Sequence, residues 1–129
     1  MNMAASTFDA RKRCVEELGK DFVRAVDAGT STPGSLDVLC KAQDDLMDTP
    51  AETLADVVYK VEASIGDVDE VGGDAEGLVL LKRAVVALRA GSVATARRML
   101  DRALEGDAEY EFAWKGAAAA FADLHRLSA

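Results

Sequence analysis

Residues 75–91 read AEGLVLLKRAVVALRAG, and this stretch decides the fold class. Four of its apolar residues recur at the spacing of one helix face: Leu78, Leu81, Val85 and Leu88. Three others extend the apolar surface around most of the helix: Val79, Leu80 and Val86. A helix that is apolar over most of its circumference belongs in the centre of a packed protein. Gly91 is the expected end of this helix.

Apolar stripes of the same period lie on both sides of this central helix. They predict helices at about residues 7–28, 36–47, 50–65 and 93–105, and a sixth that starts at Asp107. The inward residues of the sixth helix are expected to be Tyr110, Trp114, Ala117, Phe121 and Leu124. The chain has two prolines, a single isoleucine and abundant alanine, and its good helix formers far outnumber its β-branched residues. The sequence therefore predicts an all-α protein, a compact bundle of about five to six helices whose C-terminal half is a helical hairpin.

Capping residues place the expected helix ends. Ser6 or Thr7 would cap the first helix, Ser35 the second and Ser92 the fifth. The third helix has the strongest signal, because Thr49, Pro50 and Glu52 form a capping box with proline at the first helical position. Gly66 is expected to end that helix, which leaves residues 66–74 as a loop.

Length and charge limit the class of protein. The 129 residues, half of them hydrophobic, fit one domain over residues 1–129. A net charge of −8 and a pI near 4.6 argue against direct binding of nucleic acid. No apolar run approaches the roughly 20 residues of a membrane span. The N-terminal residues lack the apolar region of a secretory signal, so the expected compartment is the cytoplasm.

The sequence offers little for catalysis or metal binding. His125 is the single histidine, and no residue near it in sequence forms a catalytic pair with it. Cys14 and Cys40 lie too far apart for a zinc-binding motif, and we expect two reduced, partly buried thiols. An EF-hand starting at Asp67 would need a glutamate at its twelfth position, where Leu78 stands. We therefore expect no enzyme activity, no cofactor and no metal.

Charge is strongly segregated along the chain. Residues 37–76 hold twelve acidic and two basic residues, and residues 82–102 hold six basic residues and one acidic residue. The two segments would either pair within the fold or leave the acidic one as a surface for a basic partner. In the second case the candidate partner-binding residues are Asp44, Asp45, Asp48, Glu52, Asp56, Asp67, Asp69 and Glu70.

Residues 77–127 carry a spacing of glycine, small and bulky residues that resembles the tetratricopeptide repeat. The residues concerned are Gly91, Ala96, Leu100, Ala103, Trp114 and Phe121. Ala108 and Ala118 stand where that family has proline and glycine. The resemblance implies a protein-binding scaffold without catalytic residues.

Residues 49–60, TPAETLADVVYK, resemble a segment of small uncharacterised bacterial and prophage proteins. That resemblance implies a bacterial or phage accessory protein. The sequence thus predicts a non-catalytic regulatory protein that acts by protein–protein contact. The alternative is an acidic inhibitor that mimics nucleic acid, of the anti-CRISPR or anti-restriction type. Six amphipathic helices in 129 residues also allow a homodimer.

Overall fold

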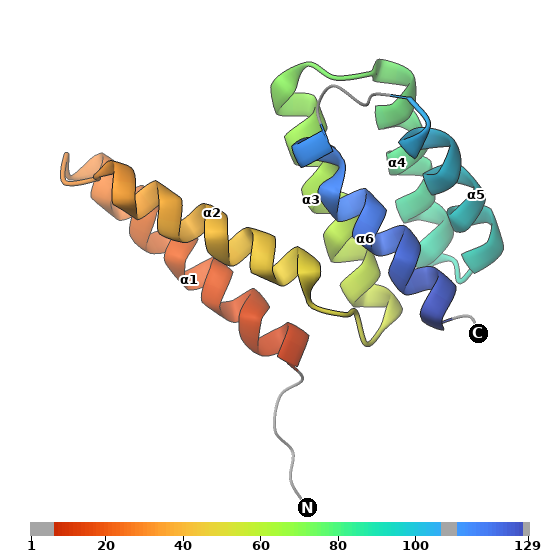
Figure 1. Cartoon of the computed structure of the whole chain (residues 1–129), viewed down its shortest axis with the longest axis horizontal. Helices are drawn as coiled ribbons and strands as arrows, with labels where there is room; N and C mark the ends of the chain where they lie inside the picture. Colours follow the sequence, from red (N-terminus) through yellow and green to blue (C-terminus); the bar gives the residue numbers. More distant parts are fainter. Residues whose placement is uncertain (1–6, 107–110, 128–129) are drawn as a thin grey trace, which may run out of the picture. The chain divides into compact units, whose positions relative to one another are not determined.

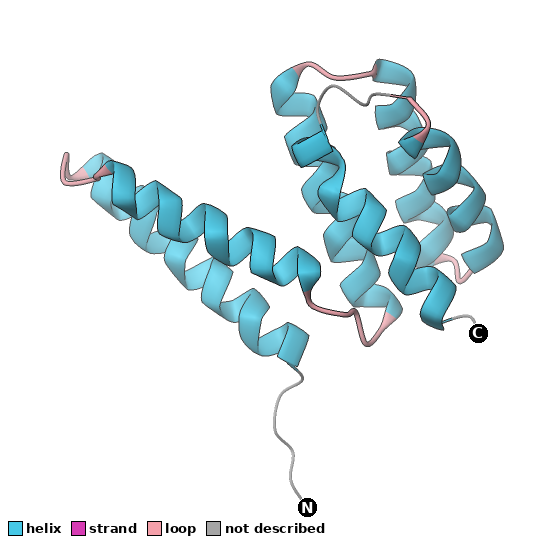
Figure 2. Ribbon diagram, in the orientation of Figure 1, coloured by secondary structure: helices cyan, strands magenta, loops and turns pink. Residues whose placement is uncertain are grey.

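The computed structural model describes residues 7–106 and 111–127 (Figure 1). These ranges contain six helices: α1 (Thr7–Asp27), α2 (Pro33–Asp48), α3 (Leu54–Val71), α4 (Ala75–Arg89), α5 (Val93–Leu104) and α6 (Glu111–Leu127). No strand occurs in the same ranges (Figure 2). The predicted all-α fold class is confirmed.

The chain divides into two compact units, residues 1–50 and residues 51–129. The first unit holds α1 and α2, and the second holds α3 to α6. The expectation of one domain over residues 1–129 stays a prediction.

In the second unit, every helix packs against two others. α3 packs against α4 and α6, and α5 packs against the same two helices, which closes a four-helix bundle (Figure 1). The side chains at the centre are fully buried, among them Val57, Val61, Leu81, Leu100 and Leu124. α4 contributes six residues to the core: Leu80, Leu81, Ala84, Val85, Ala87 and Leu88. Its predicted central position is wrong, because α4 has two neighbours like the other helices of the bundle, and Val79 and Val86 are exposed.

The first unit is a hairpin in which α1 and α2 pack side by side (Figure 1). Its buried apolar residues lie near the start of α1 and the end of α2: Phe8, Val15, Leu46 and Met47. Toward the connecting loop, four apolar side chains are about half exposed: Val23 (58%), Val26 (50%), Leu36 (46%) and Val38 (55%). The sequence pattern puts Val26 in the apolar stripe of the first helix and Leu36 on the buried side of the second, and both predictions are wrong because the two side chains are about half exposed. The predicted partial burial of Cys14 and Cys40 is also wrong, since both are exposed.

The predicted start of α3 is also wrong. The helix begins at Leu54, and its N-cap is Thr53 rather than Thr49. The Thr53 hydroxyl accepts the backbone N–H of Asp56, and the Asp56 carboxylate accepts the backbone N–H of Thr53 in return. Thr49 instead ends α2, where its hydroxyl donates to the carbonyl of Asp45. Two overlapping capping boxes compete here, and the one that starts at Thr53 forms.

The far end of α3 extends past the predicted stop at Gly66. The helix continues to Val71 and ends at Gly72, which has a left-handed backbone with φ of 67°. Val68, two residues beyond Gly66, is fully buried, and burying it offsets the cost of about 1 kcal/mol for glycine in a helix. The predicted loop over residues 66–74 therefore shrinks to residues 72–74.

Other helix ends differ less from expectation. α2 begins at Pro33, not at Leu36, because Thr32 rather than Ser35 is the N-cap and proline fits the first helical turn. The predicted helix ends at Gly29 and Gly91 are confirmed, and both glycines have positive φ. The predicted start of the sixth helix at Asp107, and Tyr110, lie outside the described residues.

The capping box of α3 predicts a measurable contribution to stability. Thr53→Ala removes the hydroxyl that satisfies the Asp56 N–H, and we expect the free energy of unfolding to fall by about 1 kcal/mol. Ser92→Ala is the matched control, because Ser92 occupies an N-cap position without a side-chain hydrogen bond. Urea denaturation followed by circular dichroism measures both. Equal losses in the two variants would contradict this assignment of the cap.

Replacing two helical glycines with alanine is expected to change the free energy of unfolding in opposite directions. At Gly66 an added Cβ meets nothing within 4 Å, so Gly66→Ala should raise the free energy of unfolding by about 0.5–1 kcal/mol. At Gly77 the Cβ would lie 2.6 Å from Cη2 of the buried Trp114, which cannot move without disturbing the core. Gly77→Ala should lower the free energy of unfolding by about 1–3 kcal/mol. Thermal and urea unfolding of the pair test this difference in sign.

Candidate functional site

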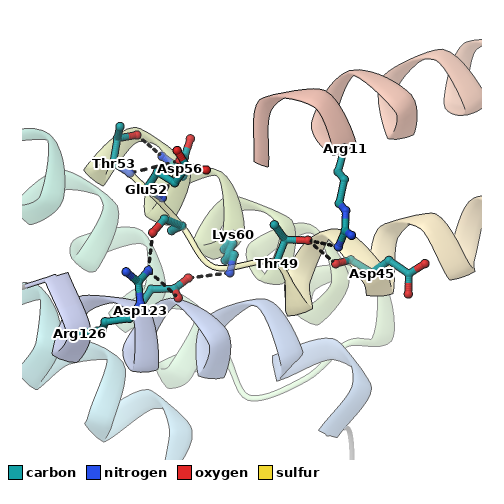
Figure 3. Close-up of polar contacts among 10 residues, drawn as sticks. Arg11, Asp45, Thr49, Glu52, Thr53, Asp56, Lys60, Asp123 and Arg126 are labelled. Atoms are coloured by element: carbon teal, nitrogen blue, oxygen red, sulfur yellow. Dashed lines mark hydrogen bonds and ion pairs between the residues drawn. The ribbon is translucent and has the colours of Figure 1, made fainter. Parts of the chain in front are cut away.

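The bundle of α3 to α6 contains a buried ion pair. Nζ of Lys60 on α3 donates to Oδ2 of Asp123 on α6 at 2.6 Å (Figure 3). The Lys60 side chain is 1% exposed and that of Asp123 is 10% exposed. A charge so far from water is tolerated only when it is paired, so these two side chains depend on one another.

Two further polar contacts tie α6 to its surroundings. The Arg126 guanidinium lies 3.5 Å from Oδ1 of Asp123 and also donates to the carbonyl of Ala51 (Figure 3). The hydroxyl of Ser64, which is fully buried, accepts the backbone N–H of Ala117 at 2.7 Å. These contacts hold α3 and α6 in one register, which is a structural role.

Sequence reasoning missed the pair of Lys60 and Asp123. Lys60 falls on the same helix face as Val57 and Ser64, so a lysine within a buried stripe was the available signal. Its partner lies 63 positions away, and no pattern in the sequence links the two residues.

The structure does not assemble a metal-binding cluster in residues 7–106 and 111–127. No group of three or more His, Cys, Asp or Glu side chains lies close enough there to hold an ion. Asp67, where an EF-hand pattern would start, lies on α3 rather than in a loop. Within the same ranges, no helix has both the length and the apolar character to span a membrane.

The eight acidic residues predicted to bind a partner fall on both units. Asp44, Asp45 and Asp48 lie on the last turns of α2, and Asp67, Asp69 and Glu70 lie near the end of α3. Glu52 and Asp56 lie at the opposite end of α3. All of them are exposed except Asp56, which is 7% exposed and accepts hydrogen bonds from the backbone of Glu52 and Thr53. The role of Asp56 as a helix cap accounts for its position.

Arg89 of the basic segment and Glu62 of the acidic segment form an exposed ion pair. Arg89 lies 3.3 Å from Glu62, with both side chains more than half exposed. Such a pair contributes about 0–1 kcal/mol, so it does little to hold α3 and α4 together.

The basic residues of α5 line a shallow depression on the bundle. A guanidinium nitrogen of Arg97 lies 2.9 Å from Nδ1 of His125, and Arg97 also borders a hollow with Arg98 and Asp101. Phe121 completes the lining, and it also packs against the core as the sequence predicted. Because Asp101 lies among these arginines, the hollow does not present a uniform charge for an anion.

The α1–α2 hairpin has an apolar groove between its helices. Its volume is about 320 Å³, and its lining residues are Leu18, Asp21, Phe22, Ala25, Ser35 and Val38. Leu18, Phe22 and Ala25 are half-buried, and Val38 is 55% exposed. Val38 was not predicted to be part of a site because it lies outside the main apolar stripe of α2, one position before Leu39.

Comparison with known proteins identifies no family or function for this chain. No protein family, curated protein or solved structure matches this chain.

The buried ion pair predicts that removing one of its charges lowers the free energy of unfolding more than removing both. Lys60→Met leaves Asp123 buried beside the more distant Arg126, and we expect a loss of about 3–5 kcal/mol in the free energy of unfolding. The double variant with Lys60→Met and Asp123→Leu removes both charges and should lose less than the single variant. Arg89→Met is the control for an exposed pair and should cost about 0–1 kcal/mol. Urea denaturation measures all three; a Lys60→Met variant as stable as Arg89→Met would contradict the buried ion pair.

Proposed function

We propose that this protein is a non-catalytic interaction protein of regulatory or accessory type, which binds a protein partner through the α1–α2 hairpin. The observation that carries the proposal is the apolar surface near the loop of that hairpin. Its centre is the groove lined by Leu18, Phe22 and Val38. Three further apolar side chains of the same two helices are also exposed: Val23, Val26 and Leu36.

Single exposed apolar residues are ordinary on a protein surface, but a group of them is not. Here four side chains between 46% and 58% exposed fall within residues 23–38, on two helices that pack together. Charged side chains such as Asp21 and Asp37 flank them. An apolar centre with a polar rim is the usual composition of a protein-binding surface.

The interior of the bundle supports a non-catalytic role. Its centre is filled by apolar side chains, and its buried charges, Lys60 and Asp123, are paired with one another. The Lys60 side chain is 1% exposed, so its ammonium is out of reach of a substrate in solution.

The acidic nucleic-acid mimic is the second candidate. It is supported by the exposure of seven of the eight predicted acidic residues, of which the largest groups are Asp44, Asp45 and Asp48 on α2 and Asp67, Asp69 and Glu70 on α3. In this case the partner would be a nuclease or defence protein with a basic channel, and its binding would weaken steeply with salt.

An affinity experiment tests the proposed surface. The immobilised full chain is incubated with bacterial lysate at low and at high salt, and captured proteins are identified by mass spectrometry. We expect Val38→Glu to abolish capture of the specific partner, because it places a carboxylate at the edge of the apolar groove. Val86→Glu is the matched control, since Val86 is a 69% exposed valine on α4.

The outcomes separate the candidates. Capture that survives high salt and is lost only in the Val38 variant supports the apolar surface. Capture that disappears at high salt and is unchanged by Val38→Glu favours the acidic mimic. Equal loss in both valine variants would contradict the assignment to the hairpin.

A further inference from the structure

We propose that the outward face of α4 binds an acidic amphipathic helix of a second protein. The centre of this face is formed by Val79 and Val86, and basic side chains lie on both sides of them. The face belongs to the bundle rather than to the hairpin, so the inference goes beyond the proposed function and does not depend on it. A partner of the hairpin requires Val38, whereas a partner of this face requires Val86, and the two are therefore distinguishable.

α4 carries a second apolar strip on the side away from the core. Val79 is 47% exposed and Val86 is 69% exposed, although other apolar residues of the same helix are buried. Seven positions separate the two valines, which places them on one face and about 10 Å apart along the helix axis. Ala75 and Ala90 are exposed at the two ends of α4, and all four residues fall within an arc of about 60°.

This strip has the features of a contact between helices. A helix that is apolar on two opposite sides is typical of one with neighbours on both, and the bundle packs α3 and α5 against the core side of α4. The spacing of seven between Val79 and Val86 is the repeat of a seam between paired helices. Small residues at the ends, Ala75 and Ala90, let a second helix approach closely. The outward strip therefore fits one further helix.

Cations flank the middle of the strip. Lys82 and Arg83 are exposed and lie on opposite sides of it, and neither forms an ion pair within residues 7–106 and 111–127. Arg89 lies on the same side as Lys82 and is 3.3 Å from Glu62 of α3. Glu76, in the first turn, is an acidic side chain on the Arg83 side. The two cations at the centre remain available to carboxylates of a partner.

The same cations disfavour a second copy of α4 as the occupant. The midpoint of the strip falls between Lys82 and Arg83, so a twofold pairing of two α4 helices would place these cations beside those of the second chain. A parallel pairing in register would do the same. Like charges placed together oppose association, whereas a helix with carboxylates along both edges of its apolar stripe pairs with both cations.

A nucleic acid matches only part of this surface. Its phosphates would pair with Lys82 and Arg83, but they would leave Val79 and Val86 without an apolar contact. The net charge of −8 on the chain also repels a polyanion at longer range. An acidic amphipathic helix satisfies the valines and the cations together.

Binding of designed peptides to the full chain tests the proposal by fluorescence anisotropy. The first probe is a labelled helical peptide of about three heptads, with leucine at a and d and glutamate at the flanking e and g positions, which repel one another and oppose self-pairing. The second probe has lysine in place of each glutamate. The third keeps the glutamates and has serine in place of each leucine. We expect the first probe alone to bind the wild-type chain.

Charge reversal locates the binding site. The variant with Lys82→Glu and Arg83→Glu should weaken binding of the first probe by about tenfold or more and should gain binding of the lysine probe. The matched control is Arg98→Glu with Arg102→Glu, which makes the same change in net charge on exposed residues of α5. It should change the affinity by less than about threefold, because long-range attraction alone is screened by salt. Circular dichroism checks that the variants are helical, and alanine replaces glutamate where a reversal prevents folding.

The remaining outcomes overturn the proposal. Failure of the first probe to bind the folded wild-type chain does so directly, and so does equal weakening by the two charge reversals. Equal binding of the serine probe would show that the valines are not used. Binding that is lost with Val38→Glu and unchanged by reversal of Lys82 and Arg83 would assign the peptide to the hairpin, which overturns this inference and leaves the proposed function standing.

Discussion

An amphipathic helix is stable in water only when neighbouring helices cover its apolar face, and a face wider than about 100° needs more than one neighbour. The four helices of residues 51–129 meet this condition by closing a ring, in which each helix packs against two others. α4 shows the effect most clearly, because its apolar residues cover most of its circumference and Leu81 and Ala84 are fully buried. Val86, 69% exposed, marks the part of α4 that no neighbour reaches. The closed ring explains why this unit has a continuous core.

The hairpin of α1 and α2 obeys the same condition but satisfies it only in part. Each helix has the other as a neighbour, and the residues between them, such as Phe8 and Leu46, are buried. The apolar residues beside that seam have nothing to cover them in the hairpin itself, and Val23 and Val38 are more than half exposed. The incomplete coverage is therefore a consequence of having two helices rather than four. In the bundle, by contrast, each helix has two neighbours, although Val79, Val86 and Phe112 stay exposed there.

Local patterns predicted what depends on local interactions. The helical stripes, and the ends at Gly29 and Gly91, follow from periodicity and backbone conformation within a few residues. The start of α3 was harder to predict, because Thr49 with Glu52 and Thr53 with Asp56 both match a capping box. Thr53 is the N-cap because Thr49 already ends α2. Gly66 fails as a stop because Val68 is buried by other helices. The candidate groove was not predicted, since exposure of Val38 depends on how far α2 is covered by its neighbour.

The contact between α3 and α6 shows why the bundle has one arrangement. Small residues on the inner face of α6, including Ala113, Ala117 and Ala120, are fully buried and let its backbone approach α3 closely. The hydrogen bond from the Ala117 N–H to the Ser64 hydroxyl requires that approach. Small apolar residues alone would allow α6 to slide along α3, because each alanine resembles the next. Any such shift would separate Lys60 from Asp123 and leave two buried charges unpaired, at a cost that apolar contacts could not recover. The ion pair therefore selects the register of a contact whose stability comes from the surrounding apolar residues.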